Sequence, residues 1–394
     1  MGLRRPHVGK TVNATDCTGC AACHSICPAN AVSMQPDKKG FLCPCVDENA
    51  CVSCGKCVQS CPVMSSSPDS VLTPVMHAYA AYSRNEDTRY LSTSGGLFTE
   101  LATVVLLEGG AVFGAAYDKD NQIAHMLVED IGDLPRLRQS KYAQSNKKGT
   151  YLEARRLLDA GRKVLYAAAP CEIAALKTLV GDPANLFTVD FLCLGCNSPL
   201  VYRKYLESLE RRAGSRVAKV WFKNKEISWN QFSTRVDFDN GSVYREDRDT
   251  DGFMRGYIVH PLYVRECCEH CHFKGTPHGS DVTLGDFWGV ERILPDIDTS
   301  HGVSVVFANT ARGVGLFEGV ASRLVWNEVP FEQTLTRANM NALTRCVKLD
   351  SRSERFYADL VAHGFDYAIR RNASDPFLLR AKRLIRKILS RGGV

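Results

Sequence analysis

Residues 17–28 read CTGCAACHSICP, and residues 51–62 repeat the same cysteine pattern as CVSCGKCVQSCP. Each segment places four cysteines at the spacing C-x2-C-x2-C-x3-C and follows the last of them with a proline. Three thiolates on such a loop can bind three irons of one 4Fe-4S cubane, while the fourth, beside the proline, reaches the other cubane. Zinc also binds four thiolates, but two complete runs with their prolines favour a bacterial-type ferredoxin domain with two 4Fe-4S clusters.

The spacing also predicts which cysteines bind each cluster. We expect the first cluster to be bound by Cys17, Cys20, Cys23 and Cys61. We expect the second cluster to be bound by Cys27, Cys51, Cys54 and Cys57. Cys43 and Cys45 lie between the two runs, and we interpret them as structural or incidental.

The remaining composition is that of an ordinary globular protein. The 394 residues are 45% hydrophobic and 23% charged, which supplies enough apolar sequence for a core without disulfides. Met1–Lys10 contains no apolar signal segment, and no stretch reaches the roughly 18 uninterrupted apolar residues of a membrane span. We therefore expect a cytoplasmic protein, in which the 17 cysteines stay reduced and serve metal binding or catalysis.

The character of the sequence changes after the second cysteine run. Short apolar runs at Ala111–Tyr117, Lys163–Ala169 and Leu186–Cys193 alternate with helical segments, which predicts an α/β layer architecture. Asn240-Gly241 between two alternating runs predicts a hairpin. Thr150 with Glu153 predicts a capping box at a helix start. The expected fold is α+β in the ferredoxin domain and α/β in the body. The expected segments are residues 1–66, the ferredoxin-like domain; 67–74, a linker; 75–345, the body, with parts at about 75–160 and 161–345; and 346–394, a helical basic tail.

The tail sequence FLLRAKRLIRKILSR at Phe377–Arg391 can form a basic amphipathic helix. Such a helix packs on the protein's own body, or it contacts an anionic membrane surface or a partner protein. The formal net charge is only +6, and no aromatic residues accompany the basic ones as they do on nucleic-acid-binding surfaces. We therefore expect no nucleic-acid binding, and the sequence does not indicate an oligomeric state.

Four further cysteines, outside the ferredoxin runs, form a candidate tetrathiolate site: Cys171, Cys193, Cys268 and Cys271. Cys171 follows a predicted strand and begins a helix, where the helix dipole favours a thiolate. Cys193 ends the next predicted strand, so adjacent parallel strands would bring the two to one sheet edge. Zinc is an alternative occupant, because histidines surround the C-x2-C pair at positions 270, 272 and 278. We expect Cys196, Cys267 and Cys346 to be unliganded.

Ser92–Gly96 reads STSGG and precedes an apolar helical run, Leu97–Leu107. The free N–H groups of a helix start can bind a phosphate or pyrophosphate of a nucleotide cofactor, although such a sequence is more often a simple helix cap. No G-x-G-x-x-G motif is present, so the sequence does not support a Rossmann domain for a nicotinamide dinucleotide.

Six short motifs follow one another in the body: STSGG at Ser92–Gly96, QSKYAQS at Gln139–Ser145, APCEIAALK at Ala169–Lys177, DFLCLGCNSP at Asp190–Pro199, CEHCHFK at Cys268–Lys274 and SDVTLGDFWGV at Ser280–Val290. With these motifs, residues 75–320 resemble the coenzyme F-420 hydrogenase/dehydrogenase beta-subunit family. The chain is most similar to bacterial members that carry a two-cluster ferredoxin domain, some of which look like proteins encoded with polysaccharide-assembly genes. One departure is Leu194, where many members have a histidine, so we name no proton donor or other catalytic residue.

The resemblance implies that the body holds FAD and a third 4Fe-4S cluster, the latter on Cys171, Cys193, Cys268 and Cys271. It also implies coenzyme F-420 as a candidate electron donor. The residues that would contact the flavin by this resemblance are Ser94, Gly95, Gly96, Ser140, Lys141, Tyr142 and Asp286. Lys141 could offset phosphate or reduced-flavin charge and Tyr142 could pack on a ring, although a surface cation and a core aromatic are equally simple interpretations. Asp286 is either a polar contact or a turn residue.

These observations predict an oxidoreductase that passes electrons from ferredoxin, another redox partner protein or reduced deazaflavin through 4Fe-4S clusters to FAD, and on to an unidentified substrate. A first alternative is a non-catalytic electron-transfer beta subunit of a larger hydrogenase or dehydrogenase complex. A second alternative is an accessory reductase in surface-polysaccharide biosynthesis.

Overall fold

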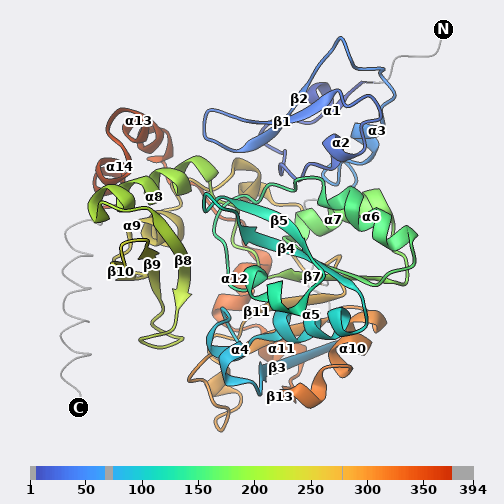
Figure 1. Cartoon of the computed structure of the whole chain (residues 1–394), viewed down its shortest axis with the longest axis vertical. Helices are drawn as coiled ribbons and strands as arrows, with labels where there is room; N and C mark the ends of the chain where they lie inside the picture. Colours follow the sequence, from blue (N-terminus) through green and yellow to red (C-terminus); the bar gives the residue numbers. More distant parts are fainter. Residues whose placement is uncertain (1–5, 67–73, 277, 375–394) are drawn as a thin grey trace.

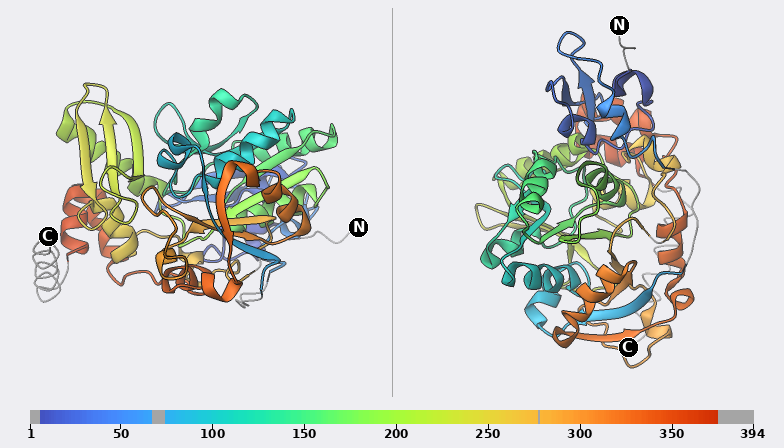
Figure 2. Two further views of the ribbon diagram at one scale, coloured as in Figure 1. Left: turned by 90° about the horizontal axis from the view of Figure 1, so that it is seen from below. Right: turned by 90° about the vertical axis from the view of Figure 1, so that its right-hand side faces the viewer.

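The cysteine-rich N-terminal segment forms a small unit that stands on a larger body (Figure 1). The computed structural model describes residues 6–66, 74–276 and 278–374. Most of the predicted linker and the basic segment Phe377–Arg391 therefore lie outside the described residues. Figure 2 shows that the N-terminal unit projects from one end of the rounded body.

The two cysteine runs fold alike, as their repeated spacing predicts. Each run turns through a left-handed residue directly after its second cysteine, Ala21 with φ +68 and Gly55 with φ +74, and then begins a single-turn helix. Between the runs lies an antiparallel hairpin in which Val32 pairs with Val46. The elements of this unit are α1 (Val8–Thr11), α2 (Ala22–Ser25), β1 (Val32–Pro36), β2 (Leu42–Val46) and α3 (Lys56–Gln59).

The body is built on an eight-stranded mixed sheet with the strand order β13-β3-β12-β11-β7-β6-β4-β5. Its central strands β11, β7, β6 and β4 are parallel, and β5, β12 and β13 run antiparallel to their neighbours. The strands are β3 (His77–Ser83), β4 (Ala111–Tyr117), β5 (Ile123–Val128), β6 (Val164–Ala167), β7 (Leu186–Phe191), β11 (Val282–Asp286), β12 (Ser304–Ala308) and β13 (Leu324–Glu328). The predicted α/β architecture is confirmed, because the three predicted runs form β4, β6 and β7.

Side chains of β4 alternate between two apolar layers, as the period of a strand requires. Val112 packs on one face with Leu101 of α5 (Leu97–Leu107), while Phe113 packs on the other with Ile173 of α7 (Pro170–Val180). The other helices around the sheet are α4 (Glu86–Tyr90), α6 (Thr150–Asp159), α10 (Ala311–Glu318), α11 (Phe331–Thr334) and α12 (Arg337–Thr344). The predicted capping box on α6 is wrong: Thr150 is already in the first turn and Gly149 precedes it, while Glu153 bonds to Arg156.

A second lobe flanks the sheet and contributes strands to the candidate site (Figure 1). Its three-stranded antiparallel sheet contains the predicted hairpin, with Val243 opposite Asp237 and Gly241 at φ +82 in the turn. An aromatic core that includes Tyr205, Phe253 and Phe356 joins this sheet to the helices. The elements are α8 (Pro199–Ala213), β8 (Val217–Asn224), β9 (Ser233–Phe238), β10 (Val243–Asp247), α9 (Gly252–Met254), α13 (Ser353–His363) and α14 (Phe365–Asn372). Within the described ranges, no helix is long and apolar enough to cross a membrane.

Candidate redox sites

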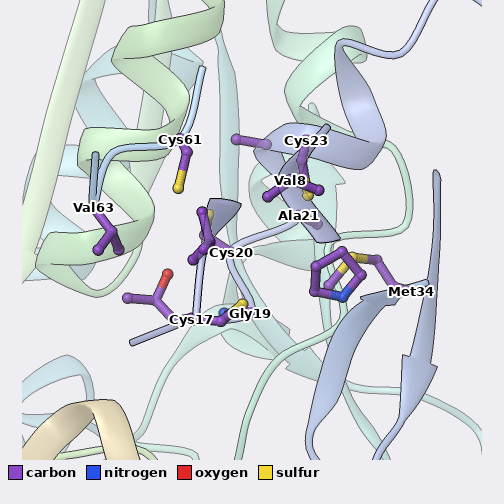
Figure 3. A pocket seen from close by; sticks show the side chains of 13 residues that line it. Val8, Cys17, Gly19, Cys20, Ala21, Cys23, Met34, Cys61 and Val63 are labelled. Carbon is purple, nitrogen blue, oxygen red and sulfur yellow. The ribbon is translucent and has the colours of Figure 1, made fainter. Parts of the chain in front are cut away.

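The first predicted cysteine set surrounds a small apolar cavity in the N-terminal unit (Figure 3). The cavity is lined by Cys17, Cys20, Cys23 and Cys61 together with apolar side chains. The pKa of Cys20 is raised to about 11, mainly by burial and to a smaller extent by the nearby thiols of Cys17 and Cys61. The four thiols share one enclosed space, and this donor set fits a 4Fe-4S cluster.

The second predicted set lies in the same unit and shares a small core with the first. Cys57 is buried in a small core with Cys23, and Cys27 packs against this core. Backbone N–H groups donate to both sulfurs, from Val8 to Cys57 Sγ over 3.4 Å and from Ala31 to Cys27 Sγ over 3.2 Å. Such bonds stabilise negative charge on a ligand sulfur and so raise the reduction potential of a cluster.

The remaining two cysteines of this set are half-buried on the loop that leads into α3. Val52, between Cys51 and Cys54, has 65% of its surface exposed to solvent. The second set is therefore the one with a loop that faces outward.

The third set gathers at the carboxyl edge of the main sheet. β6 and β7 are adjacent and parallel, with Ala167 opposite Val189, so Cys171 after β6 and Cys193 after β7 leave the sheet at the same edge. Burial raises the pKa of Cys171, and the nearby thiols of Cys271 and Cys193 also raise it. Burial likewise raises the pKa of Cys193 to about 12, with further contributions from Cys268 and Cys271. Each of the four thiols thus lies close enough to at least two of the others to affect their pKa.

Close backbone approach brings the two halves of this set together. Gly195 has φ +118, and a Cβ there would lie 2.7 Å from Val264 Cγ1 and 3.5 Å from Cys268 Cβ. Two backbone N–H groups donate to the sulfurs, from Gly195 to Cys193 Sγ and from Phe273 to Cys271 Sγ, each over 3.4 Å. The Cys193 loop and the C-x2-C segment can therefore meet only because residue 195 has no side chain.

The histidines near the C-x2-C pair have other partners. His272 lies 3.1 Å from Ser66 Oγ, and His278 lies 3.0 Å from the carboxylate of Asp190. In the part of the chain that the structure describes, no three His, Cys, Asp or Glu side chains lie close enough together for a single metal ion.

Three cysteines that we expected to be unliganded nevertheless lie near the third set. The thiols of Cys267 and Cys268 are hydrogen-bonding neighbours. Cys268 lies close enough to Cys196 to raise its pKa, and Cys346 lies close enough to Cys271 to raise the pKa of Cys271. The proximity of Cys267 and Cys196 follows from the sequence, since they lie one residue from Cys268 and three residues from Cys193, whereas that of Cys346 depends on tertiary packing.

The first and third sets adjoin each other across helix α7. Cys20 packs in the same core as Ile173 of α7, and its thiol contributes to the raised pKa of Cys171. Thr178, also in α7, donates to the carbonyl of Ser60 over 2.9 Å, directly before Cys61. One helix therefore carries a member of the third set and contacts the binding loops of the first.

The STSGG loop lies at the same edge of the sheet and is held by internal hydrogen bonds. Ser94 Oγ donates to the carbonyl of Val303 over 2.8 Å, and the Gly95 N–H donates to Ser304 Oγ over 3.0 Å. A Cβ at Gly95 would lie 2.4 Å from the carbonyl oxygen of Ala81. Gly96, with φ +89, is the N-cap of α5. The Gly95 amide is thus already used, and the Thr99 N–H in the first turn of α5 also has a partner, because it donates to the carbonyl of Gly96 over 3.1 Å.

The second predicted flavin segment lies against this loop. The Ser140 N–H donates to Thr93 Oγ1 over 2.8 Å. Tyr142 packs edge-on against Phe222, with ring centroids 5.3 Å apart. Lys141 is half-buried and donates to the carbonyl of Arg138, and loss of hydration lowers its pKa to about 7.

Two lysines that the sequence did not single out complete the site. Asp286, at the end of β11, accepts hydrogen bonds from Lys223 Nζ and, over 3.0 Å, from Trp229 Nε1. Lys225 Nζ donates to the carbonyl of Ser94 over 2.8 Å, and burial lowers its pKa to about 7. Burial raises the pKa of Tyr142, which also lies within the field of Lys223 and Asp286. The structure thus brings Ser94, Tyr142 and Asp286 to one polar region around Lys223 and Lys225, and Gly95, Gly96, Ser140 and Lys141 lie beside them in the chain.

Tyr257 connects this region to the third cysteine set. Its ring lies 5.6 Å from that of Tyr142, and its hydroxyl donates to the carbonyl of Gly195 over 3.4 Å. Burial raises its pKa, and Cys193 contributes to the shift. The predicted flavin region and the third set are therefore separated by one aromatic side chain.

Comparisons with known proteins match two regions of the chain to family models. Residues 161–334 match the family model of the C-terminal region of the coenzyme F420 hydrogenase/dehydrogenase beta subunit, and residues 16–65 match the 4Fe-4S dicluster domain. The chain is 20% identical over 336 residues to the F subunit of the F(420)H(2) dehydrogenase of Methanosarcina mazei, and the match covers 82% of this chain and 88% of that protein. It is 46% identical over 44 residues to the ferredoxin-type protein NapF of Haemophilus influenzae, and that match covers 11% of this chain and 25% of that protein.

A solved structure is also similar, a chain from the F420-reducing NiFe hydrogenase complex of Methanosarcina barkeri. The TM-score is 0.49 at 19% sequence identity, over 70% of this chain and 91% of that chain. The chain thus carries a 4Fe-4S dicluster domain and a region that matches the C-terminal part of the coenzyme F420 hydrogenase/dehydrogenase beta subunit, and it is an iron–sulfur electron-transfer protein related to those beta subunits.

Proposed function

We propose that the protein is an FAD- and 4Fe-4S-dependent oxidoreductase that passes electrons from ferredoxin or reduced deazaflavin to an unidentified substrate. The observation that carries this proposal is the spatial order of the three cysteine sets and the candidate flavin region. The second set has an outward loop and shares a core with Cys23 of the first. The first set adjoins Cys171 across α7, and the third reaches the flavin region through Tyr257.

The bound groups would supply the redox chemistry: the clusters carry single electrons, and FAD joins one-electron to two-electron steps. The chain's own residues hold these groups in sequence and control their surroundings. Cys17, Cys20, Cys23 and Cys61 exclude water from the first cavity together with its apolar lining. Lys223 stays protonated beside Asp286, whereas burial lowers the pKa of Lys141 and Lys225 to about 7, so a bound anion such as a flavin phosphate or a reduced flavin would favour the protonated form of both.

A second candidate function is a non-catalytic electron-transfer component of a larger complex. It is favoured by the name of the similar protein from Methanosarcina mazei, which is a subunit of a dehydrogenase. Two large apolar side chains on either side of Cys193 also face solvent, Phe191 with 46% and Leu194 with 47% exposure. A partner protein would bury them. The third alternative, an accessory reductase in surface-polysaccharide biosynthesis, rests on the sequence resemblance alone.

The deciding experiment is anaerobic purification with iron, sulfide and flavin measured per chain. About twelve irons and about one FAD, with the flavin bleached by reduced ferredoxin or reduced deazaflavin, would support the oxidoreductase and identify its donor. About eight irons without flavin would remove the proposed body cofactors and favour the electron-transfer component.

A pair of variants makes this count specific. Cys171→Ser should lower the iron content by about four, because it removes a thiol of the third set. Cys45→Ser is the matched control, since Cys45 is exposed and belongs to none of the three sets. Equal iron contents in the two variants would contradict the proposed third cluster.

A further inference from the structure

Arg265 contacts both the first and the third cysteine set. Its side chain reaches into the N-terminal unit, where Nε donates to the carbonyl of Cys17 over 2.6 Å and Nη1 donates to that of Leu42 over 3.2 Å. Its backbone belongs to the third set, because its N–H donates to the carbonyl of Cys196 and its carbonyl accepts from the N–H of Cys268. One residue therefore links the binding loop of the first set to the C-x2-C segment of the third.

The guanidinium of Arg265 is buried, with 4% of the residue exposed. A buried cation is costly unless negative charge compensates it. Its acceptors are two neutral carbonyls and, over 3.1 Å, Cys43 Sγ. Among the residues that the structure describes, the groups with the largest electrostatic effect on it are thiols and none is a carboxylate. The ionisable groups around it are the thiols of Cys43, Cys17, Cys267 and Cys196.

We propose that Arg265 is a positioning residue that compensates the negative charge of the first cluster and of the third, while holding their binding segments together. The proposal rests on the function proposed above. When a one-electron donor protein reduces a cluster, one negative charge is added and no bond is formed or broken. A fixed guanidinium beside the cluster stabilises that charge and so raises the reduction potential.

Arg265 also differs from a residue that only docks the two units. Gln144 makes a comparable set of docking bonds without a charge: its amide donates to the carbonyl of Gly19 over 3.2 Å and accepts from the N–H of Leu42 over 2.7 Å. Gln144→Ala therefore removes docking contacts to the same loop and leaves the charge in place. Arg265→Lys keeps the charge and removes the planar fork.

The test is an EPR-monitored redox titration of the full chain, purified anaerobically, with iron measured in every sample. For Arg265→Met we expect the equilibrium constant for reduction of two clusters to fall at least tenfold, which is about 59 mV for one electron. The signal of the second cluster, which would be bound by Cys27, Cys51, Cys54 and Cys57, should not move. Arg265→Lys should recover most of the shift, and Gln144→Ala should leave the potentials unchanged.

Unchanged potentials in Arg265→Met at full iron content would overturn the proposal, as would an equal shift in Gln144→Ala. If Arg265→Met loses iron, the Arg265→Lys variant takes its place in the test. Normal reduction potentials in Arg265→Lys would support charge compensation, and an iron loss equal to that of Arg265→Met would overturn the proposal. Failure of the proposed function is separable, because it appears as about eight irons in the unmodified chain. In that case a shift of the first cluster alone still supports the role of Arg265 there.

Discussion

Replacing Gly195 by alanine should displace the third cluster and leave the other two in place. Gly195 has φ +118, and an added Cβ would lie 2.7 Å from Val264 Cγ1. The backbone conformation would cost an alanine about 1–3 kcal/mol. The forced contact would add about 1–3 kcal/mol more, since Val264 is buried and has little room to move. Roughly 2–6 kcal/mol would thus oppose the approach of the Cys193 loop to Cys268, which weakens cluster binding at least about tenfold.

The assay compares Gly195→Ala with Gly214→Ala after anaerobic purification, by iron content and by the EPR spectrum of the reduced protein. Gly214 has φ +62, and its Cβ would meet nothing within 4 Å, so this control carries only the cost of a left-handed alanine, about 1 kcal/mol. We expect about eight irons in Gly195→Ala and about twelve in the control. Full iron in Gly195→Ala, with an unfolding midpoint equal to that of the control, would refute the reasoning.

Three further predictions concern the flavin region and its support. Tyr142→Ala should lower FAD content severalfold, while Tyr142→Phe should retain it, because packing of the ring is expected to matter more than the hydroxyl. Glu172→Gln should destabilise the fold by about 3 kcal/mol, because it breaks a buried pair with Lys147. Burial lowers the pKa of Lys141 to about 7, so the folded chain releases this proton earlier than the unfolded chain, and the free energy of unfolding should rise with pH above about 7. Lys141→Met should flatten that rise in flavin-free protein.

Each of these predictions has its own control. For the flavin content, equal loss in both Tyr142 variants would show that the ring does not contact the cofactor. Chemical unfolding of Glu153→Gln provides the comparison for Glu172→Gln, since the Glu153–Arg156 pair is on the surface and should contribute no more than about 0.5 kcal/mol. For Lys141, urea titrations between pH 6 and 9 suffice. A slope that persists in Lys141→Met would assign the proton to another group, Lys225 being the first to examine.

The parts of the fold that the sequence predicted are those in which local pattern and tertiary structure agree. The apolar run at Ala111–Tyr117 becomes β4 with the same ends, because both faces of this central strand are covered by helices. Asn240-Gly241 forms the predicted turn because Gly241 supplies the positive φ that the turn needs. The capping box predicted at Thr150 is wrong because this pattern is short, and Gly149 takes the left-handed position before the helix.

The site residues that the sequence did not predict are charged side chains, and their role depends on which strands and loops come into contact in the folded chain. Lys223 and Lys225 look like ordinary solvent-facing positions in the run WFKNK. They are buried because the second lobe brings β8 against the end of β11, where Asp286 accepts from Lys223. Arg265 likewise has no local pattern, because its partners lie more than 200 residues earlier in the chain. A lone basic residue near a cysteine pair was the only available signal.

Helix α7 shows why these sites form a series although the chain supplies their parts out of order. Its first turn carries Cys171, where the helix N-terminus stabilises a thiolate. Glu172, the next residue, accepts from the Ala169 N–H over 3.1 Å and pairs with buried Lys147, which fixes that turn. Thr178, two turns later, bonds to the carbonyl of Ser60 before Cys61. Because a helix is rigid over this length, the first and third cysteine sets are held at a fixed separation, and a change that loosens α7 should disturb electron transfer between them before it unfolds either unit.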